Sequence, residues 1–188
     1  MRIRTVAAVA CLAAAVGAAG ARTPNLANVT IAPLDDQYAA SCRLQSGLTP
    51  EILEEIDAGL ETTISYKLNL YRKRTGFVDE TMVRRRVRCT VRHDSLTRQY
   101  TLTRRVDGEV QDTQVTEDPK VMREFLTSLD RLPLVGRNEI LEGQEYYLKA
   151  KADVGLIWRF YLIPWPLDTD WVRVPLGPAE GRSIDAKP

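Results

Sequence analysis

TMVRRRVRCTVRHDSLTRQYTLTRRV, residues 81–106, decides the fold of this chain. Apolar and polar residues alternate on both sides of a short polar segment, which predicts two antiparallel strands joined by a turn. A four-residue turn at 94–97 pairs Val91 with Tyr100 and Cys89 with Leu102. This register gathers the apolar side chains on one face of the hairpin.

The opposite face of the predicted hairpin carries a row of like charges: Arg84, Arg86, Arg88, Arg92 and Arg105. In this register Arg86 lies opposite Arg105, and Arg88 lies opposite Thr103. Guanidinium groups bind phosphate and carboxylate through paired hydrogen bonds, so the row is a candidate anion-binding face. The alternative is a solvated sheet face that acidic residues of the same fold neutralise.

The flanking sequence predicts more strands and two helices. Alternation predicts strands at 38–45, 62–72, 109–115 and 145–154, with a closing strand at 171–176. Thr49-Pro50 and Asp118-Pro119 are typical helix starts, followed by apolar stripes over 50–58 and 119–129. Segments 73–80 and 132–143 are predicted loops. The expected fold is mainly β or α+β: one antiparallel, sandwich-like domain with two helices on its open face.

The N-terminal sequence resembles an export signal. Arg2 and Arg4 precede the apolar run 5–17, and Ala19-Gly20-Ala21 is a small-residue cleavage site. This predicts a signal peptide at 1–21, an extended leader at 22–36, a single domain at 37–176 and a disordered tail at 177–188. The protein is expected to be periplasmic or extracellular, with an uncleaved membrane anchor as the alternative.

The two cysteines of the predicted mature chain are Cys42 and Cys89. An oxidising compartment permits a disulfide between them, and the alternative is two buried, unpaired side chains.

With 26 basic and 25 acidic residues the net charge is +1, which does not favour a nucleic-acid partner. Export and the lack of aromatic residues beside the arginines argue against one as well.

Catalytic and cofactor motifs are absent from the sequence. His93 is the single histidine, so a site with several imidazole ligands is excluded. The run His93-Asp94-Ser95 lies in one tight turn and cannot aim three side chains at one another as a catalytic triad requires. Neighbouring carboxylates are interpreted as solvated acids; they occur at Asp35/Asp36, Glu54/Glu55 and Asp168/Asp170. Phosphate-binding glycine loops are missing. We therefore expect no cofactor, no metal and no enzymatic activity.

Several stretches resemble one family of exported bacterial proteins, domain of unknown function 4390. They are LTPEILEEIDAGLETTISYKLNLYR from Leu48, HDSLTRQYTL from His93, DPKVMREFLTSLDRL from Asp118, LEGQEYYLKAKADV from Leu141 and WPLDTDWVRVPL from Trp165. The resemblance implies an exported β-rich domain and supplies no catalytic residues. The arginine row and the two cysteines are not features of that resemblance.

The expected function is non-enzymatic. We expect an exported envelope protein that binds an envelope protein or an anionic ligand through its sheet and loops. A second hypothesis is a peripheral membrane or polyanion binder that uses the arginine row together with Tyr161, Trp165 and Trp171, because Trp and Tyr favour the membrane interface. The apolar segment 155–165 is interpreted as core and alternatively as interfacial. An enzyme of unrecognised type is the third hypothesis.

Overall fold

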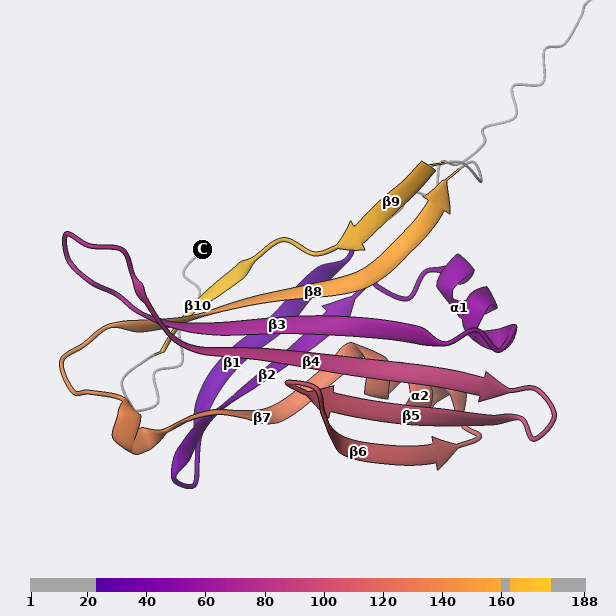
Figure 1. Ribbon diagram of the computed structural model, residues 1–188, viewed down its shortest axis with the longest axis horizontal. Coiled ribbons are helices and arrows are strands. Elements are labelled where there is room, and N and C mark those ends of the chain that lie inside the picture. Colours follow the sequence, from indigo (N-terminus) through magenta and orange to yellow (C-terminus); the bar gives the residue numbers. More distant parts are fainter. Residues whose placement is uncertain (1–22, 160–162, 177–188) are drawn as a thin grey trace, which may run out of the picture.

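The fold consists of two antiparallel sheets that share one hydrophobic core (Figure 1). The computed structural model describes residues 23–159 and 163–176, with the backbone alone between 156 and 166. The large sheet has seven strands in the order β10-β8-β3-β4-β5-β6, with β9 paired to β8, and the small sheet has the order β1-β2-β7. The predicted antiparallel β-rich fold with two helices is confirmed.

The bounds of the elements follow the chain in order. The large sheet contains β3 (Thr62–Arg72), β4 (Glu80–Asp94), β5 (Gln99–Val106), β6 (Glu109–Thr116), β8 (Tyr146–Arg159), β9 (Ile163–Asp168) and β10 (Val172–Leu176). The small sheet contains β1 (Asn25–Leu34), β2 (Gln37–Gln45) and β7 (Ser128–Gly136). The helices are α1 (Pro50–Asp57), α2 (Pro119–Thr127) and the short 3-10 helix η1 (Arg137–Glu139).

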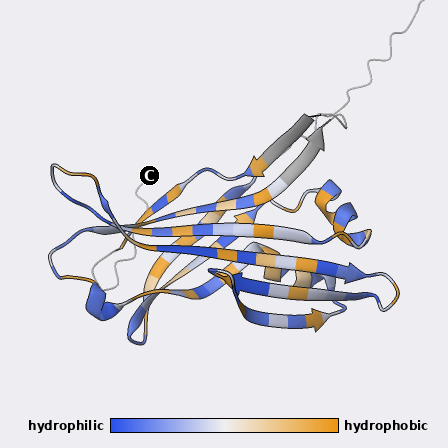
Figure 2. Cartoon of the chain, viewed as in Figure 1, coloured by the Kyte–Doolittle hydropathy of each residue, from blue (hydrophilic) through white to orange (hydrophobic). Residues whose placement is uncertain are grey.

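The core lies between the sheets because alternate residues of the large sheet face inward. Figure 2 shows hydrophobic and hydrophilic residues alternating along β3, β4 and β5. Ile64, Tyr66, Leu68 and Leu70 of β3 are each 1% exposed or less. The phenol of Tyr66 donates a hydrogen bond of 2.6 Å to the Leu126 carbonyl of α2. The buried phenol of Tyr66 thus has a hydrogen-bond partner inside the core.

Both helices begin where the sequence predicted. The Thr49 hydroxyl accepts a bond from the Ile52 amide, and Pro50 is the first residue of α1. The Asp118 carboxylate accepts from the Lys120 amide at 2.8 Å, with Pro119 as the first residue of α2. Such side chains satisfy amides that have no partner in the first helical turn.

The small sheet and both helices pack against the inner side of the large sheet. α2 buries Met122, Phe125 and Leu126 against it and lies behind β4 and β5 in Figure 1. α1 contacts β3 and β4 at one end of the sheet. The outer side of β4 therefore remains exposed within the described part of the chain.

The hairpin pairs in a different register from the predicted one. Val91 lies opposite Leu102, and Cys89 lies opposite Arg104, a shift of two residues. A two-residue shift keeps every side chain on its predicted face, so burial does not distinguish the two registers. The turn decides: Asp94 Oδ1 accepts from the Leu96 and Thr97 amides, and Arg98 takes a positive φ of 57°.

Two segments predicted as a leader and a loop are strands. β1 occupies most of 22–36, and β7 runs through the start of 132–143. Both lack regular alternation because their ladders are interrupted: β1 at Asn28, which has a positive φ, and β7 next to Pro133. Within the segment 155–165, residues 155–159 belong to β8 and residues 163–165 belong to β9, and these two strands pair with each other. The predicted signal peptide and tail lie outside the described residues.

Candidate functional site: a basic sheet face

Six cationic side chains occupy the outer side of three neighbouring strands, and we call them the basic face. They are Lys67 from β3, Arg84, Arg86, Arg88 and Arg92 from β4, and Arg105 from β5. Their positions follow from the pleat of β4, because Val87, Cys89 and Val91 point inward with no exposed surface. The five arginines predicted to share a face do so, and the four on β4 are all exposed.

Cross-strand pairing places like charges directly opposite each other. Lys67 has Arg86 on one side and Lys151 on the other, and Arg88 lies opposite Arg105. Lys151 is ion-paired with Asp168. Within residues 23–159 and 163–176, no ion pair is formed by any member of the basic face. Like charges in this arrangement are destabilising unless an anion answers them.

Two further arginines of the hairpin, Arg85 and Arg104, point inward and form hydrogen bonds within the fold. Arg104 lies 4.7 Å from the Phe125 ring centroid, and its guanidinium donates to the carbonyls of Phe125 and Ser128. Arg85 Nη1 donates to Asp107 Oδ2 at 2.8 Å. The Nε atoms of both are buried without a hydrogen-bond partner in the described structure. Arg104 thus connects β5 to the end of α2, and Arg85 connects β4 to Asp107 in the turn between β5 and β6.

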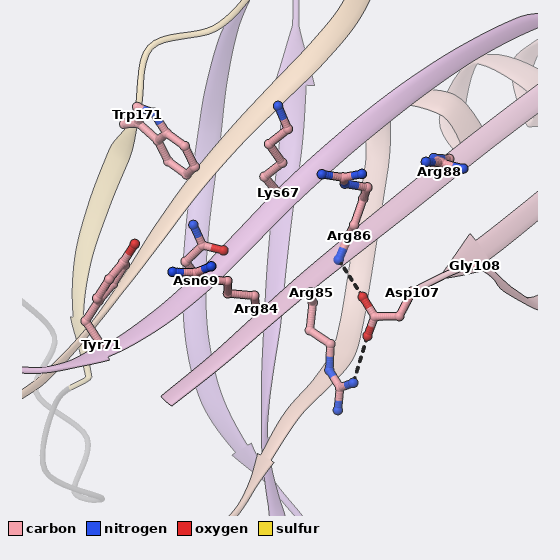
Figure 3. A pocket seen from close by; sticks show the side chains of 10 residues that line it. All are labelled: Lys67, Asn69, Tyr71, Arg84, Arg85, Arg86, Arg88, Asp107, Gly108 and Trp171. Atoms are coloured by element: carbon pink, nitrogen blue, oxygen red, sulfur yellow. Dashed lines mark hydrogen bonds and ion pairs between the residues drawn. The ribbon is translucent and has the colours of Figure 1, made fainter. Parts of the chain in front are cut away.

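Asp107 is held by neighbours in the turn between β5 and β6. Its second oxygen accepts from the Arg86 amide at 2.8 Å, as Figure 3 shows. Burial raises the pKa of Asp107, but the Arg86 amide and the Arg85 guanidinium outweigh burial and hold that pKa below its usual range. The carboxylate is thus anchored to Arg85 and to backbone.

A depression of about 600 Å³ lies over the basic face. Lys67, Arg84, Arg86 and Arg88 line it, Asp107 and Gly108 close one end, and Trp171 borders the other (Figure 3). Asn69 lies between Arg84 and Lys149 in the cross-strand row, so it places an amide among the cations. Volumes of 300–1,000 Å³ are typical of small-ligand sites.

An aromatic and cationic cluster adjoins the depression. The rings of Tyr71 and Tyr147 stack with centroids 5.2 Å apart, and Arg173 lies 3.6 Å above the Tyr147 centroid. Lys149 lies 5.4 Å from the Tyr71 centroid. The Tyr147 hydroxyl donates to Asp79, and this bond raises the pKa of Tyr147. Cation–π contacts therefore hold these cations over the sheet.

The three aromatic residues predicted to be interfacial are not described equally. Trp171 is 46% exposed and borders the depression. Tyr161 lies outside the described residues, and Trp165 is described only by its backbone in β9. Trp171 is the one member of that trio that the structure brings to the arginines.

Cys42 and Cys89 are both buried, and both are free thiols in the structure. They belong to different sheets, on β2 and β4. Burial, followed by the electrostatic effects of Cys89 and Asp130, raises the pKa of Cys42 to about 12. Burial also raises the pKa of Cys89, against the opposing effect of Arg104. Neither environment favours a reactive thiolate.

His93 and the carboxylates have ordinary structural surroundings. The His93 ring stacks on Tyr100 with centroids 4.5 Å apart, and Nδ1 lies 3.2 Å from the Asp57 carbonyl oxygen. The backbone amides of Leu96 and Thr97 hold the pKa of Asp94 below its usual range. Among the described residues, no group of three His, Cys, Asp or Glu side chains is arranged to hold a metal ion.

Lys67 and Asn69 are two site residues on β3 that the sequence interpretation missed. The alternation of 62–72 placed both on the polar side of that strand. Their proximity to the arginines depends on the pairing of β3 with β4, residues 67 with 86 and 69 with 84. Hydrophobic pattern alone does not specify which strands are neighbours.

Comparison with known proteins identifies a family but no characterised relative. No helix in the described ranges is long and apolar enough to cross a membrane. No curated protein and no solved structure matches the chain. One family model matches residues 21–155, a range that contains β1 to β7 and most of β8 and includes every residue that lines the depression except Trp171. The chain therefore belongs to the family defined by the domain of unknown function DUF4390.

Proposed function

We propose that this protein is a non-enzymatic binding module of the cell envelope and that its basic face holds an extended anionic polymer. The observation that carries the proposal is the set of six outward cations without an ion pair among the described residues. Arg88 and Arg105 lie opposite each other, as do Lys67 and Arg86, so like charges repel in the free protein. A bound polyanion would remove that repulsion.

The shape of the basic face favours a linear ligand. Arg84 and Arg92 lie eight residues apart on one strand, which corresponds to about 27 Å at roughly 3.4 Å per residue. Lys67 and Arg105 lie on either side of this row. An extended polymer can therefore place several of its charges on the row at once. A single small anion would contact only one or two of these cations.

Export is the second part of the proposal, and it is supported by the basic and apolar N-terminal sequence. The measurement is the mass of the protein recovered after expression of the whole chain in a bacterial host. A chain that begins at Arg22 in the periplasmic fraction is expected. An intact N-terminus in the membrane fraction would replace cleavage with an anchor, and a cytoplasmic chain of full length would contradict export.

Binding is tested with fluorescent polyglutamate in anisotropy titrations between 20 and 200 mM salt. We expect affinity to fall steeply with salt, because counterions are released from a densely charged polymer when it binds cations. Arg86→Glu with Arg88→Glu should abolish binding. Lys120→Glu with Arg123→Glu, on the exposed side of α2, makes the same change in net charge and is the matched control.

The control decides what a loss of binding means. Loss in the β4 variant and retention in the α2 variant support the basic face as the binding site. Equal loss in both would assign binding to net charge alone. Binding by the β4 variant at wild-type affinity would refute the proposal.

A further inference from the structure

The depression contains groups that a purely charged ligand does not need. Its lining combines cations with the neutral amide of Asn69 and the indole of Trp171. Figure 3 shows the indole facing the depression beside Lys67, with Asn69 between it and Arg84. The site therefore offers three kinds of contact within one cavity: charge, hydrogen bonding to neutral groups, and an apolar surface.

Each kind of contact matches one feature of a charged sugar. Guanidinium and ammonium groups bind carboxylate, sulfate or phosphate. An amide side chain both donates and accepts hydrogen bonds, as neighbouring hydroxyl groups require. A partly exposed indole offers a flat apolar surface with one polar edge, onto which the C–H side of a sugar ring can pack. Trp171 is 46% exposed, so much of this surface is free.

The same geometry argues against two other anionic partners. A bilayer presents its phosphates in a plane, and peripheral proteins meet it with apolar groups that project from the surface. Here the amide and Lys67 lie on the floor of a depression, on β3. Single-stranded nucleic acid is bound by successive aromatic platforms along a basic groove. Trp171 and Tyr71 are the aromatic residues that line this depression in the described structure, and Tyr71 is already stacked on Tyr147.

We propose that the ligand of the basic face is a linear acidic polysaccharide, with its acidic groups on the β4 arginines and a sugar ring against Trp171. This inference rests on the proposed function and names its ligand class. The depression of about 600 Å³ takes the sugar unit next to Trp171 and Asn69. The rest of the arginine row, from Arg88 to Arg92, takes the following acidic units as the polymer continues along β4.

The test compares probes that share charge and differ in sugar. Isothermal titration calorimetry at one salt concentration uses oligogalacturonate, polyglutamate of equal charge, a single-stranded oligonucleotide of equal charge, and a neutral oligosaccharide of equal length. We expect oligogalacturonate to bind most tightly and the neutral oligosaccharide not to bind. Trp171→Ala should weaken oligogalacturonate binding by roughly three- to tenfold, the size expected for one aromatic contact, and leave polyglutamate binding unchanged.

Matched variants separate stacking from general effects. Phe77→Ala removes an aromatic side chain that is 80% exposed in the β3–β4 loop and does not line the depression, so both affinities should stay at wild-type values. Trp171→Phe keeps a smaller ring and should fall between wild type and Trp171→Ala. If Trp171→Ala loosens β10, circular dichroism will show it, and the test then rests on Trp171→Phe, which should still bind oligogalacturonate more weakly than wild type.

The outcomes distinguish this inference from the proposed function. Equal affinity for polyglutamate and oligogalacturonate, with no effect of Trp171→Ala, would overturn the polysaccharide assignment while leaving the basic face as a polyanion site. Tighter binding of the oligonucleotide would overturn it in favour of nucleic acid. A parallel titration with anionic lipid vesicles of equal charge would overturn it in favour of a membrane surface if the vesicles bind more tightly than oligogalacturonate. No binding of any anion would overturn both.

Discussion

Replacing Arg88 by glutamine is expected to make the free protein more stable. Arg88 lies directly opposite Arg105 and two residues from Arg86 on the same side of β4. The Cβ atoms of directly opposite residues lie about 5 Å apart, and residues two apart on one strand lie about 7 Å apart. At those distances two like charges in water repel by about 0.8 and about 0.6 kcal/mol, respectively, before screening. Arg88→Gln removes both repulsions and keeps a long polar side chain.

The salt concentration determines how much the Arg88→Gln substitution stabilises the folded protein. With a Debye length of about 30 Å at 0.01 M salt, most of the repulsion persists, and the two pairs together cost about 1 kcal/mol. With a Debye length of about 8 Å at 0.15 M salt, the cost falls to about 0.7 kcal/mol. The melting temperature of a chain of this size should rise by roughly 2–4 °C at low salt.

The assay is urea unfolding followed by circular dichroism at both salt concentrations. Arg43→Gln is the control, because Arg43 Nη2 lies 2.6 Å from Glu124 Oε1 and both side chains are about half exposed. Removing this attraction should lower the free energy of unfolding slightly or leave it unchanged. A loss of stability in Arg88→Gln, or a gain that does not shrink with salt, would refute the electrostatic reasoning. A gain in stability combined with weaker polyanion binding is the trade-off expected of a functional surface.

Three further predictions concern the core and the surface acids. Tyr66→Phe should lower the free energy of unfolding by about 1–3 kcal/mol in urea titrations, because the buried Leu126 carbonyl loses its donor. Tyr38→Phe is its control, since no hydrogen bond of the Tyr38 hydroxyl is found among the described residues, and an equal loss in both variants would contradict the assignment. Cys42 and Cys89 should resist iodoacetamide in the folded protein, because burial raises the pKa of both thiols, and each should be alkylated in urea without reductant. A mass without two adducts in urea would instead show the disulfide. Stability should fall as the pH drops below about 4.5, because hydrogen bonds from Arg72 to Glu80 and from backbone amides to Asp94 hold the pKa values of these acids below their unfolded values of about 4. Their contribution is complete above the unfolded pKa and is lost as the pH falls through the folded pKa, so a melting temperature that stays constant from pH 6 to pH 2.5 would contradict it.

The elements that the sequence predicted best are those with uninterrupted local patterns. The strand at 62–72 was predicted with its observed bounds because its alternation is unbroken, and both helices begin at the predicted proline. β1 and β7 were missed for the opposite reason. A bulge at Asn28 and the irregular pairing around Pro133 interrupt the period of two that identifies a strand.

The hairpin at 81–106 shows the same division within one element. Its alternation determined that Arg84, Arg86, Arg88, Arg92 and Arg105 share a face, because the side chains of a strand point to opposite sides in turn. The register was not determined, since a shift of two residues preserves every face. The Asp94 cap and the positive φ of Arg98 decided it, and they moved Arg88 opposite Arg105.

The sequence by itself therefore determined the class of fold, the helix starts and the chemical identity of the basic face. Only the tertiary structure decided that β3 lies beside β4, which brings Lys67 and Asn69 to the arginines, and that β10 returns beside β8, which brings Trp171 to the same depression. The physical reason is that periodicity reports which side of a strand is buried. It carries no information on which distant strand supplies the hydrogen bonds at its edge.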